Sequence, residues 1–118
     1  MLNKKNRLAK DREIKRVFAR GRVFLNSAAA LKFLRLPGET ESRFAIVVST
    51  KVSKKAARRN RLKRLVREEL RRKIKFLPKG DYALSLRPAA EKLEEGEFIG
   101  IISQLLAKTA GEINNIRK

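Results

Sequence analysis

Apolar residues recur at helical spacing in three parts of the chain. They lie three and four positions apart over about 12–20, over 55–75 and again after Pro88. This spacing predicts three amphipathic helices, each with one face turned toward a core. The positions that define the stripes are Ile14, Val17 and Phe18; Leu62, Leu65, Val66, Leu70 and Ile74; and Phe98, Ile101, Ile102, Leu105 and Leu106.

Residues typical of helix ends flank these stripes. Asp11 can cap the first helix, and Gly21 suits the position after its last turn. The segment 78–80 (Pro-Lys-Gly) breaks the second helix. The third helical region is expected to break near Gly96 and to stop at Gly111.

Three shorter runs are typical of strands. Residues 43–49 contain Ala-Ile-Val-Val, a β-branched and buried-looking run, and residues 81–86 return as a short strand. Residues 28–36 are ambiguous by propensity, but the Pro-Gly turn that follows favours a hairpin with 43–49 through 37–42. The order α-β-β-α-β-α predicts an α/β (α+β) two-layer sandwich with a small sheet.

The length of 118 residues suits one domain, so we expect residues 1–118 to form a single domain. Residues 1–10 are expected to be a basic arm and residues 112–118 a flexible tail. No run approaches the roughly 18 apolar residues of a membrane span, and the N-terminal region has no apolar segment typical of a secretory signal. We expect a cytoplasmic protein.

Charge is concentrated in two blocks. The chain has 31 Lys and Arg against 12 Asp and Glu, a net charge of +19. Residues 1–22 hold nine basic and two acidic residues, and residues 51–75 hold thirteen and two. Two such blocks, separated by an apolar segment, predict two patches that the fold brings onto one polyanionic partner. The plain alternative is a solvated helix face in a protein that is merely basic.

Histidine and cysteine are both absent, which excludes Cys-His catalysis, disulfides and the usual zinc sites. The aspartates are Asp11 and Asp81 alone, and no paired carboxylates have the spacing of a two-metal site. We therefore predict no catalytic residues and no metal site on the protein, and the sequence argues against a nuclease that works without another component.

The second helix carries a row of cations. Asn60, Arg64, Arg67 and Arg71 align along it at i, i+4, i+7 and i+11, roughly opposite the apolar stripe. Arg guanidinium groups match phosphate oxygens two at a time, so such a row can follow a phosphate backbone. The residues Arg61 and Lys63 flank the row, and Arg58 and Arg59 occupy the first turn.

The run over 59–68, Arg-Asn-Arg-Leu-Lys-Arg-Leu-Val-Arg-Glu, closely resembles the RNR motif of the bacterial ribonuclease P protein subunit. Weaker matches occur in the same order along nearly the whole chain. They are Lys5-Asn6-Arg7-Leu8, Val17-Phe18 with Gly21, Val48-Ser49-Thr50-Lys51-Val52 and Lys79-Gly80-Asp81-Tyr82.

The resemblance implies a mixed sheet with a left-handed βαβ crossover through the long helix, as in the second domain of a small-subunit ribosomal protein. The general rule for such crossovers is right-handed. The resemblance also implies a partner, a large catalytic RNA that holds the Mg²⁺ ions and removes the 5′ leader of precursor tRNA. We expect one protein per RNA, and no cofactor bound tightly by the protein.

The family's binding residues can be carried over by position. Those implied to contact the catalytic RNA are Lys51, Lys55, Arg58, Arg59, Asn60, Arg61, Lys63, Arg64, Arg67 and Arg71, with Lys4, Lys5 and Arg7 in the basic arm. The implied cleft for the leader is lined by Ile14, Phe18, Lys32, Ser49 and Lys51. Relatives often carry aromatic residues at Ile14 and near Lys32, so this cleft would rely more on charge than on stacking.

Two other function classes fit parts of the sequence. A structural ribosomal protein or RNA chaperone would share the size, charge and α/β pattern, but has no reason to carry the RNR run. A nonspecific DNA-binding module lacks support, because the sequence shows no helix-turn-helix, zinc finger or dimer heptad.

Overall fold

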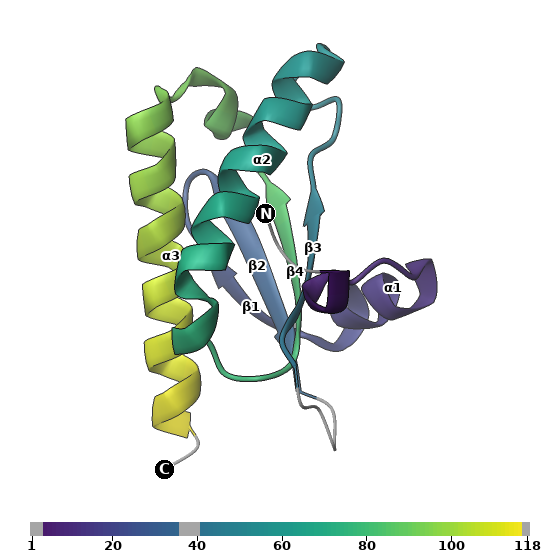
Figure 1. Cartoon of the computed structure of the whole chain (residues 1–118). Coiled ribbons are helices and arrows are strands. Elements are labelled where there is room, and N and C mark those ends of the chain that lie inside the picture. The colour runs from purple at the N-terminus through teal and green to yellow at the C-terminus, as the bar shows by residue number, and fades with distance from the viewer. Residues whose placement is uncertain (1–3, 36–40, 117–118) are drawn as a thin grey trace.

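The computed structural model describes residues 4–35 and 41–116, with the side chains of 114–116 left out. Figure 1 shows a sheet with two long helices across one face and a short helix at the other side. In chain order the elements are η1 (Lys4–Asn6), α1 (Asp11–Arg20), β1 (Arg22–Leu25), β2 (Ala29–Leu34), β3 (Arg43–Val47), α2 (Ala56–Lys73), η2 (Ile74–Phe76), β4 (Asp81–Leu86), η3 (Pro88–Lys92) and α3 (Glu95–Ile116).

The predicted fold class is confirmed, as a small α+β domain with a four-stranded mixed sheet in the order β1-β2-β4-β3. Strand β4 pairs antiparallel with β2 and parallel with β3. In Figure 1, β3 and β4 both point upward, α2 crosses in front of them, and β4 lies to the left of β3. This path is a left-handed crossover, as the resemblance implied.

The predicted hairpin between 28–36 and 43–49 is wrong, because β4 lies between these two strands. Five of the six β4 residues are buried, whereas the β3 residues are buried only in part. Helices cover both faces of β4, so this strand is the centre of the sheet and β3 is an edge. The turn residues in 36–40 lie outside the described residues.

Strand β1 was not predicted. It is four residues long, and only Phe24 of the four points into the core. A turn at Asn26 joins it to β2, in which the Asn26 side-chain oxygen accepts hydrogen bonds from the N–H groups of Ala28 and Ala29, both at 2.9 Å. The Asn26 amide also donates to the Ile101 carbonyl of α3 at 3.2 Å. These bonds help to hold β1 in place. The apolar pattern of the strand itself is too short to predict it.

Helix ends differ from the prediction at Asp11 and Gly111, whereas Gly21 follows the last turn of α1 as predicted. Asp11 is the first residue of α1 and does not cap it, because Lys10 holds the extended cap position. Gly21 has an ordinary negative φ, and it is needed because a Cβ there would lie 2.5 Å from the Val17 carbonyl oxygen. The predicted stop at Gly111 is wrong, since α3 continues to Ile116 and Ile113 is buried in the core. Residues 112–116 are therefore helix rather than tail.

The core has two parts, one on each face of the sheet. The larger lies under α2 and α3, where the Tyr82 ring contacts those of Phe33 and Phe44, each at a centroid distance of 4.8 Å. The smaller lies under α1 and contains Leu8, Val17, Ala45 and Ala83. Among the described residues, part of this second face stays uncovered, where Val23, Leu25 and Val47 are exposed.

Candidate RNA-binding surface

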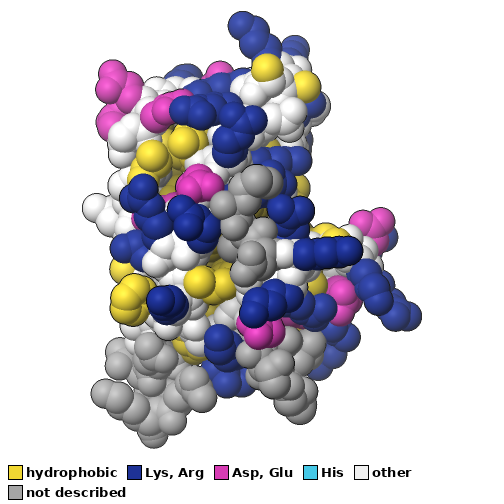
Figure 2. Space-filling model, in the orientation of Figure 1, with side chains coloured by type: hydrophobic (Ala, Val, Ile, Leu, Met, Phe, Trp, Pro, Cys, Tyr) yellow, Lys and Arg dark blue, Asp and Glu magenta, His cyan; other side chains and the backbone are white. Residues whose placement is uncertain are grey.

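The cation row lies on the outward face of α2. Leu62, Val66 and Leu70 are fully buried against the sheet on the opposite side of the helix. Asn60, Arg64 and Arg71 are exposed and Arg67 is half-buried, so the predicted row exists as a surface feature. Figure 2 shows Lys and Arg side chains spread over this face of the molecule, with few acidic side chains among them.

Three arginines near the start of α2 are bound within the chain. Arg61 forms a two-pronged ion pair with Glu95 at the beginning of α3, with N–O distances of 2.7 and 2.8 Å. Arg58 donates to the Glu91 and Leu93 carbonyls, at 3.3 and 3.5 Å. Arg59 donates to the Ser53 carbonyl at 2.8 Å. These groups tie α2 to neighbouring segments, and in this arrangement their guanidinium groups are not fully available to a phosphate.

Arg61 and Glu95 each shift the pKa of the other so that its charged form is favoured. Hydrogen bonding to Arg61 lowers the pKa of the Glu95 carboxyl, and hydrogen bonding to Glu95 raises the pKa of Arg61. Both side chains are nearly half exposed, so the pair is open to exchange with an external anion.

Of the other predicted cations on or before α2, only Arg71 has a side-chain partner among the described residues, namely Glu68 at 3.3 Å. The unpartnered side chains on or before α2 are Lys51, Lys55, Lys63, Arg64 and Arg67. They form a continuous set of groups that can each meet a phosphate without first breaking an internal bond.

The basic arm is fixed to the edge of the sheet. Arg7 forms a parallel bridge with Phe44, and the Leu8 N–H donates to the Phe44 carbonyl at 2.8 Å. The Asn6 side chain donates to the Ser42 carbonyl at 2.8 Å. Leu8 is buried under α1. Of the predicted arm residues, Lys5 pairs with Glu41 at 3.6 Å, while Lys4 and Arg7 have no described side-chain partner.

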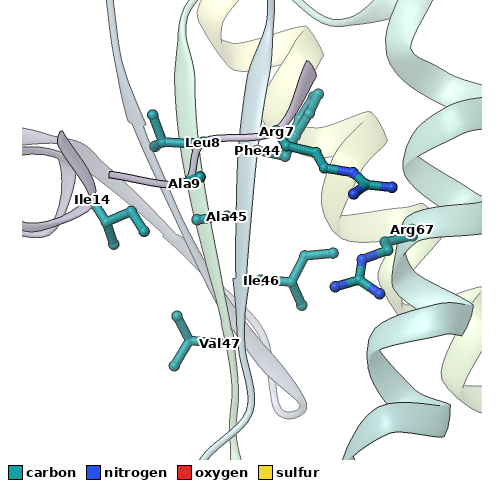
Figure 3. A pocket seen from close by; sticks show the side chains of 9 residues that line it. All are labelled: Arg7, Leu8, Ala9, Ile14, Phe44, Ala45, Ile46, Val47 and Arg67. Atoms are coloured by element: carbon teal, nitrogen blue, oxygen red, sulfur yellow. The ribbon is translucent and has the colours of Figure 1, made fainter. Parts of the chain in front are cut away.

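The arm and α2 face each other across a groove of about 240 Å³ at the β3 edge. Figure 3 shows Arg7 from the arm and Arg67 from α2 pointing into the same space beside Ile46. None of the described residues that line this groove carries a carboxylate. Arg7 of the first basic block and Arg67 of the second, which are far apart in the sequence, therefore line one groove.

The residues of the predicted leader cleft lie on α1, on β2 and beyond the end of β3. Ile14 and Phe18 are half-buried on α1, where they pack against the smaller core. The Lys32 ammonium donates to the Phe18 carbonyl at 2.6 Å and lies 5.4 Å from the centre of the Phe18 ring. Ser49 and Lys51 are exposed beyond the end of β3.

Sequence reasoning missed three apolar residues on the same face of the sheet. Val23 and Leu25 of β1 and Val47 of β3 are 46%, 53% and 37% exposed. They alternate with core residues along their strands, so they point away from α2 and α3. Alternation in residues 22–25 was the available signal, but four residues are too few for it to stand out.

A partly buried ion-pair network holds α1 on the sheet. Arg43 donates to both Asp81 oxygens, at 2.9 and 2.8 Å, and contacts Glu13 of α1 at 3.0 Å. These bonds, chiefly the one to Asp81, raise the pKa of Arg43. Asp81 is fully buried, so this aspartate serves the fold.

No group of three or more His, Cys, Asp or Glu side chains is placed to hold a metal ion among the described residues. None of the helices described has both the length and the apolar character needed to cross a membrane.

Comparison with known proteins gives one consistent answer. The sequence profile of the family described as Ribonuclease P matches residues 2–110. The ribonuclease P protein component of Rippkaea orientalis is 33% identical over 112 residues, covering 91% of this chain and 88% of that protein. That of Bacillus velezensis is 32% identical over 109 residues, covering 92% and 93%.

Solved structures agree with this result. The ribonuclease P protein from Thermotoga maritima superposes with a TM-score of 0.74 at 32% identity, covering 86% of this chain and 96% of that one. The Staphylococcus aureus protein has a TM-score of 0.82 at 20% identity, covering 86% and 93%, which supports the fold. The chain belongs to the ribonuclease P protein family, the protein component of an RNA-processing enzyme that acts in tRNA processing.

Proposed function

We propose that this chain joins a large catalytic RNA, one protein per RNA, and assists removal of the 5′ leader from precursor tRNA in the cytoplasm. The observation that carries the proposal is the set of unpartnered cations on the outward face of α2, beside the fixed arm. Cations spaced along a helix fit the phosphate backbone of a structured RNA. The RNA holds the Mg²⁺ ions and performs the phosphodiester hydrolysis.

In this proposal the leader lies on the sheet face that α1 leaves uncovered. Phe18 offers an aromatic edge, Lys32 and Lys51 offer charge, and the exposed Val23 and Leu25 offer apolar contact. The protein binds and orients the leader, and contributes no group to the chemistry. Such positioning raises the rate by holding the scissile phosphate near the RNA's metal ions.

The first experiment is single-turnover cleavage of a precursor tRNA at low Mg²⁺, with a bacterial ribonuclease P RNA, in the presence and absence of this protein. We expect strong stimulation of cleavage at the mature 5′ end. Tight binding to structured RNA without stimulation would instead favour a structural ribosomal protein or an RNA chaperone.

A matched pair of charge reversals tests the binding surface. Arg64→Glu places a negative charge in the row, whereas Lys108→Glu reverses one charge at an exposed residue of α3, outside the row. We expect the Arg64 variant to lose at least about tenfold in affinity for the catalytic RNA, because one phosphate contact is replaced by repulsion. Equal losses for both folded variants would show that the row has no special role.

A further inference from the structure

Phe76 is the most exposed large apolar side chain among the described residues, at 71%. It ends η2, a single turn of 3-10 helix that follows α2 directly. The other three exposed large apolar residues all lie on the uncovered sheet face. Phe76 instead follows the end of α2 and lies beside α3. The end of α2 is in the lower half of Figure 1. The proposed leader surface therefore does not account for it.

A small apolar groove adjoins the Phe76 ring. It has a volume of about 130 Å³ and lies between the end of α2 and the middle of α3. Ala107 and Ala110 form its α3 side, and their short side chains leave the space open. Leu77 and Leu106 form its apolar floor, and Lys73 stands at its rim. The site thus combines an exposed ring, a shallow apolar recess and a cation.

The charge around Phe76 is entirely positive in the local sequence. Residues 71–79 contain five Lys and Arg and no Asp or Glu. Lys73, Lys75 and Lys79 have no side-chain partner among the described residues. The acidic residues that directly precede this stretch in the sequence are engaged, since Glu68 contacts Arg71 and Glu69 contacts Arg72. A partner for this site must be anionic and must also present a flat apolar face.

A second copy of the chain does not meet these requirements. A symmetric contact through Phe76 would bring the lysines of each copy against those of the other, in a protein whose net charge is +19. A nucleotide does meet them, because its base stacks on an aromatic ring while its phosphates contact nearby cations. The site is also connected to the cation row, since Arg71 and Lys75 continue it toward η2. Asn60 and Phe76 are about 24 Å apart along the helix direction.

We propose that Phe76 is a stacking platform for an unpaired RNA base, with the phosphates of that nucleotide held by Lys73 and Lys75. The proposal rests on RNA being the partner, as proposed above, and adds a second contact at the far end of α2. The base belongs to a loop or a single-stranded segment, because a base inside a duplex has no free face.

The chain contains no tryptophan, so Phe76→Trp places a single fluorescent reporter at the site while keeping an aromatic surface. The probe is a six-nucleotide oligoadenylate, compared with an abasic strand of the same length and charge. We expect the oligoadenylate to quench the fluorescence and the abasic strand to leave it nearly unchanged. Equal effects of both strands, or none from either, would overturn the platform.

Affinity for structured RNA provides the second test. Phe76→Ala removes the ring, and Phe76→Leu keeps an apolar side chain of similar reach but cannot stack. We expect both to lose at least about fivefold in affinity for whichever RNA supplies the base, the catalytic RNA or the precursor tRNA, measured separately. Wild-type affinity in Phe76→Leu would show that simple apolar packing suffices, which contradicts stacking.

These outcomes are distinguishable from failure of the proposed function. Stimulated leader cleavage, together with Phe76→Trp fluorescence that oligoadenylate does not quench, would keep the function and reject the platform. Base-dependent quenching without any stimulation of cleavage would keep the platform and reject the processing role. Capture of an acidic peptide by the reporter site, with no response to oligoadenylate, would replace RNA by protein as the occupant.

Discussion

At the scale of single residues, the partners of the arginines decide which of them can meet RNA. The RNR run places Arg61 beside the cation row, and helical spacing identifies it as exposed. Spacing cannot show that Glu95, 34 positions later, occupies its guanidinium group. The residue types of the surface were therefore predictable from the sequence, but which cations are free was not, because that depends on a long-range contact.

Neutralising Glu95 should release Arg61 to the RNA. In Glu95→Gln the two-pronged ion pair is lost, and Arg61 gains freedom to contact a phosphate. We expect tighter binding to the catalytic RNA and a slope of log K against log salt that is steeper by about one. Glu97→Gln is the matched control, since it makes the same change two residues away at a side chain whose one hydrogen-bond partner among the described residues is the Glu94 N–H, at 3.4 Å. Unchanged binding and slope in Glu95→Gln would mean that Arg61 serves the fold alone.

Tyr82 should make the fold sensitive to alkaline pH. It is fully buried, and its hydroxyl donates to the Pro78 carbonyl at 2.6 Å. Burial raises the pKa of this hydroxyl above its ordinary value, which is about 10. The folded state therefore keeps the proton where the unfolded chain loses it, so this contribution to stability is complete below about pH 10 and declines as pH rises above it.

Tyr82→Phe separates this effect from the titration of lysines. The variant should lose about 1 kcal/mol at neutral pH, the usual contribution of one hydrogen bond. Its free energy of unfolding should then fall less steeply than that of the wild type above about pH 10, in denaturant titrations followed by circular dichroism. Because Tyr82 is the only tyrosine, tyrosinate absorbance reports its ionisation directly. Parallel alkaline profiles for the two proteins would contradict this account.

At the scale of elements, the long periodic segments were predictable and the strand pairing was not. The apolar stripe of α2 and the β-branched run of β3 each follow from local spacing. Strand pairing depends on which strand is buried on both of its faces, because that strand takes a central position in the sheet. Here this strand is β4, the last strand in the chain. Neighbours in sequence are the natural first guess for a hairpin, and here they are separated by the later strand.

The end of α3 makes a measurable contribution to stability. Ile113 is 4% exposed and packs in the larger core, two residues past the glycine at which the helix was expected to stop. Ile113→Ala should lower the free energy of unfolding by about 2 kcal/mol, toward the low end for buried aliphatic residues because the site is near a helix terminus. Lys108→Ala, on the exposed side of α3, should change it by less than about 0.5 kcal/mol. A loss no larger than in this control would support the flexible tail instead.

At the scale of the whole molecule, partnered and free cations together set the salt dependence of RNA binding. The predicted arm and helix set contains twelve Lys and Arg residues. Seven of them lack a side-chain partner among the described residues, namely Lys4, Arg7, Lys51, Lys55, Lys63, Arg64 and Arg67. If only these seven meet phosphates, log K should fall with log salt with a slope of about 6 rather than about 11.

Titrations of the catalytic RNA at several monovalent salt concentrations would measure this slope. A value near the larger figure would mean that RNA displaces the internal ion pairs as well, including those of Arg58, Arg61 and Arg71. In that case Arg61 already contacts a phosphate in the wild type, so Glu95→Gln should leave the slope of log K against log salt unaltered.

The arm that runs beside β3 has a second consequence, for self-association. An edge strand exposes unpaired backbone N–H and C=O groups, and another chain can pair with them. Residues 7 and 8 occupy part of this edge through the Arg7–Phe44 bridge and the Leu8 hydrogen bond, and Arg7 adds a charge beside it. The same residues that we propose to contact RNA thus also cover part of the exposed edge of the sheet. A shortened arm would leave the β3 edge open to pairing with a strand of another copy of the chain.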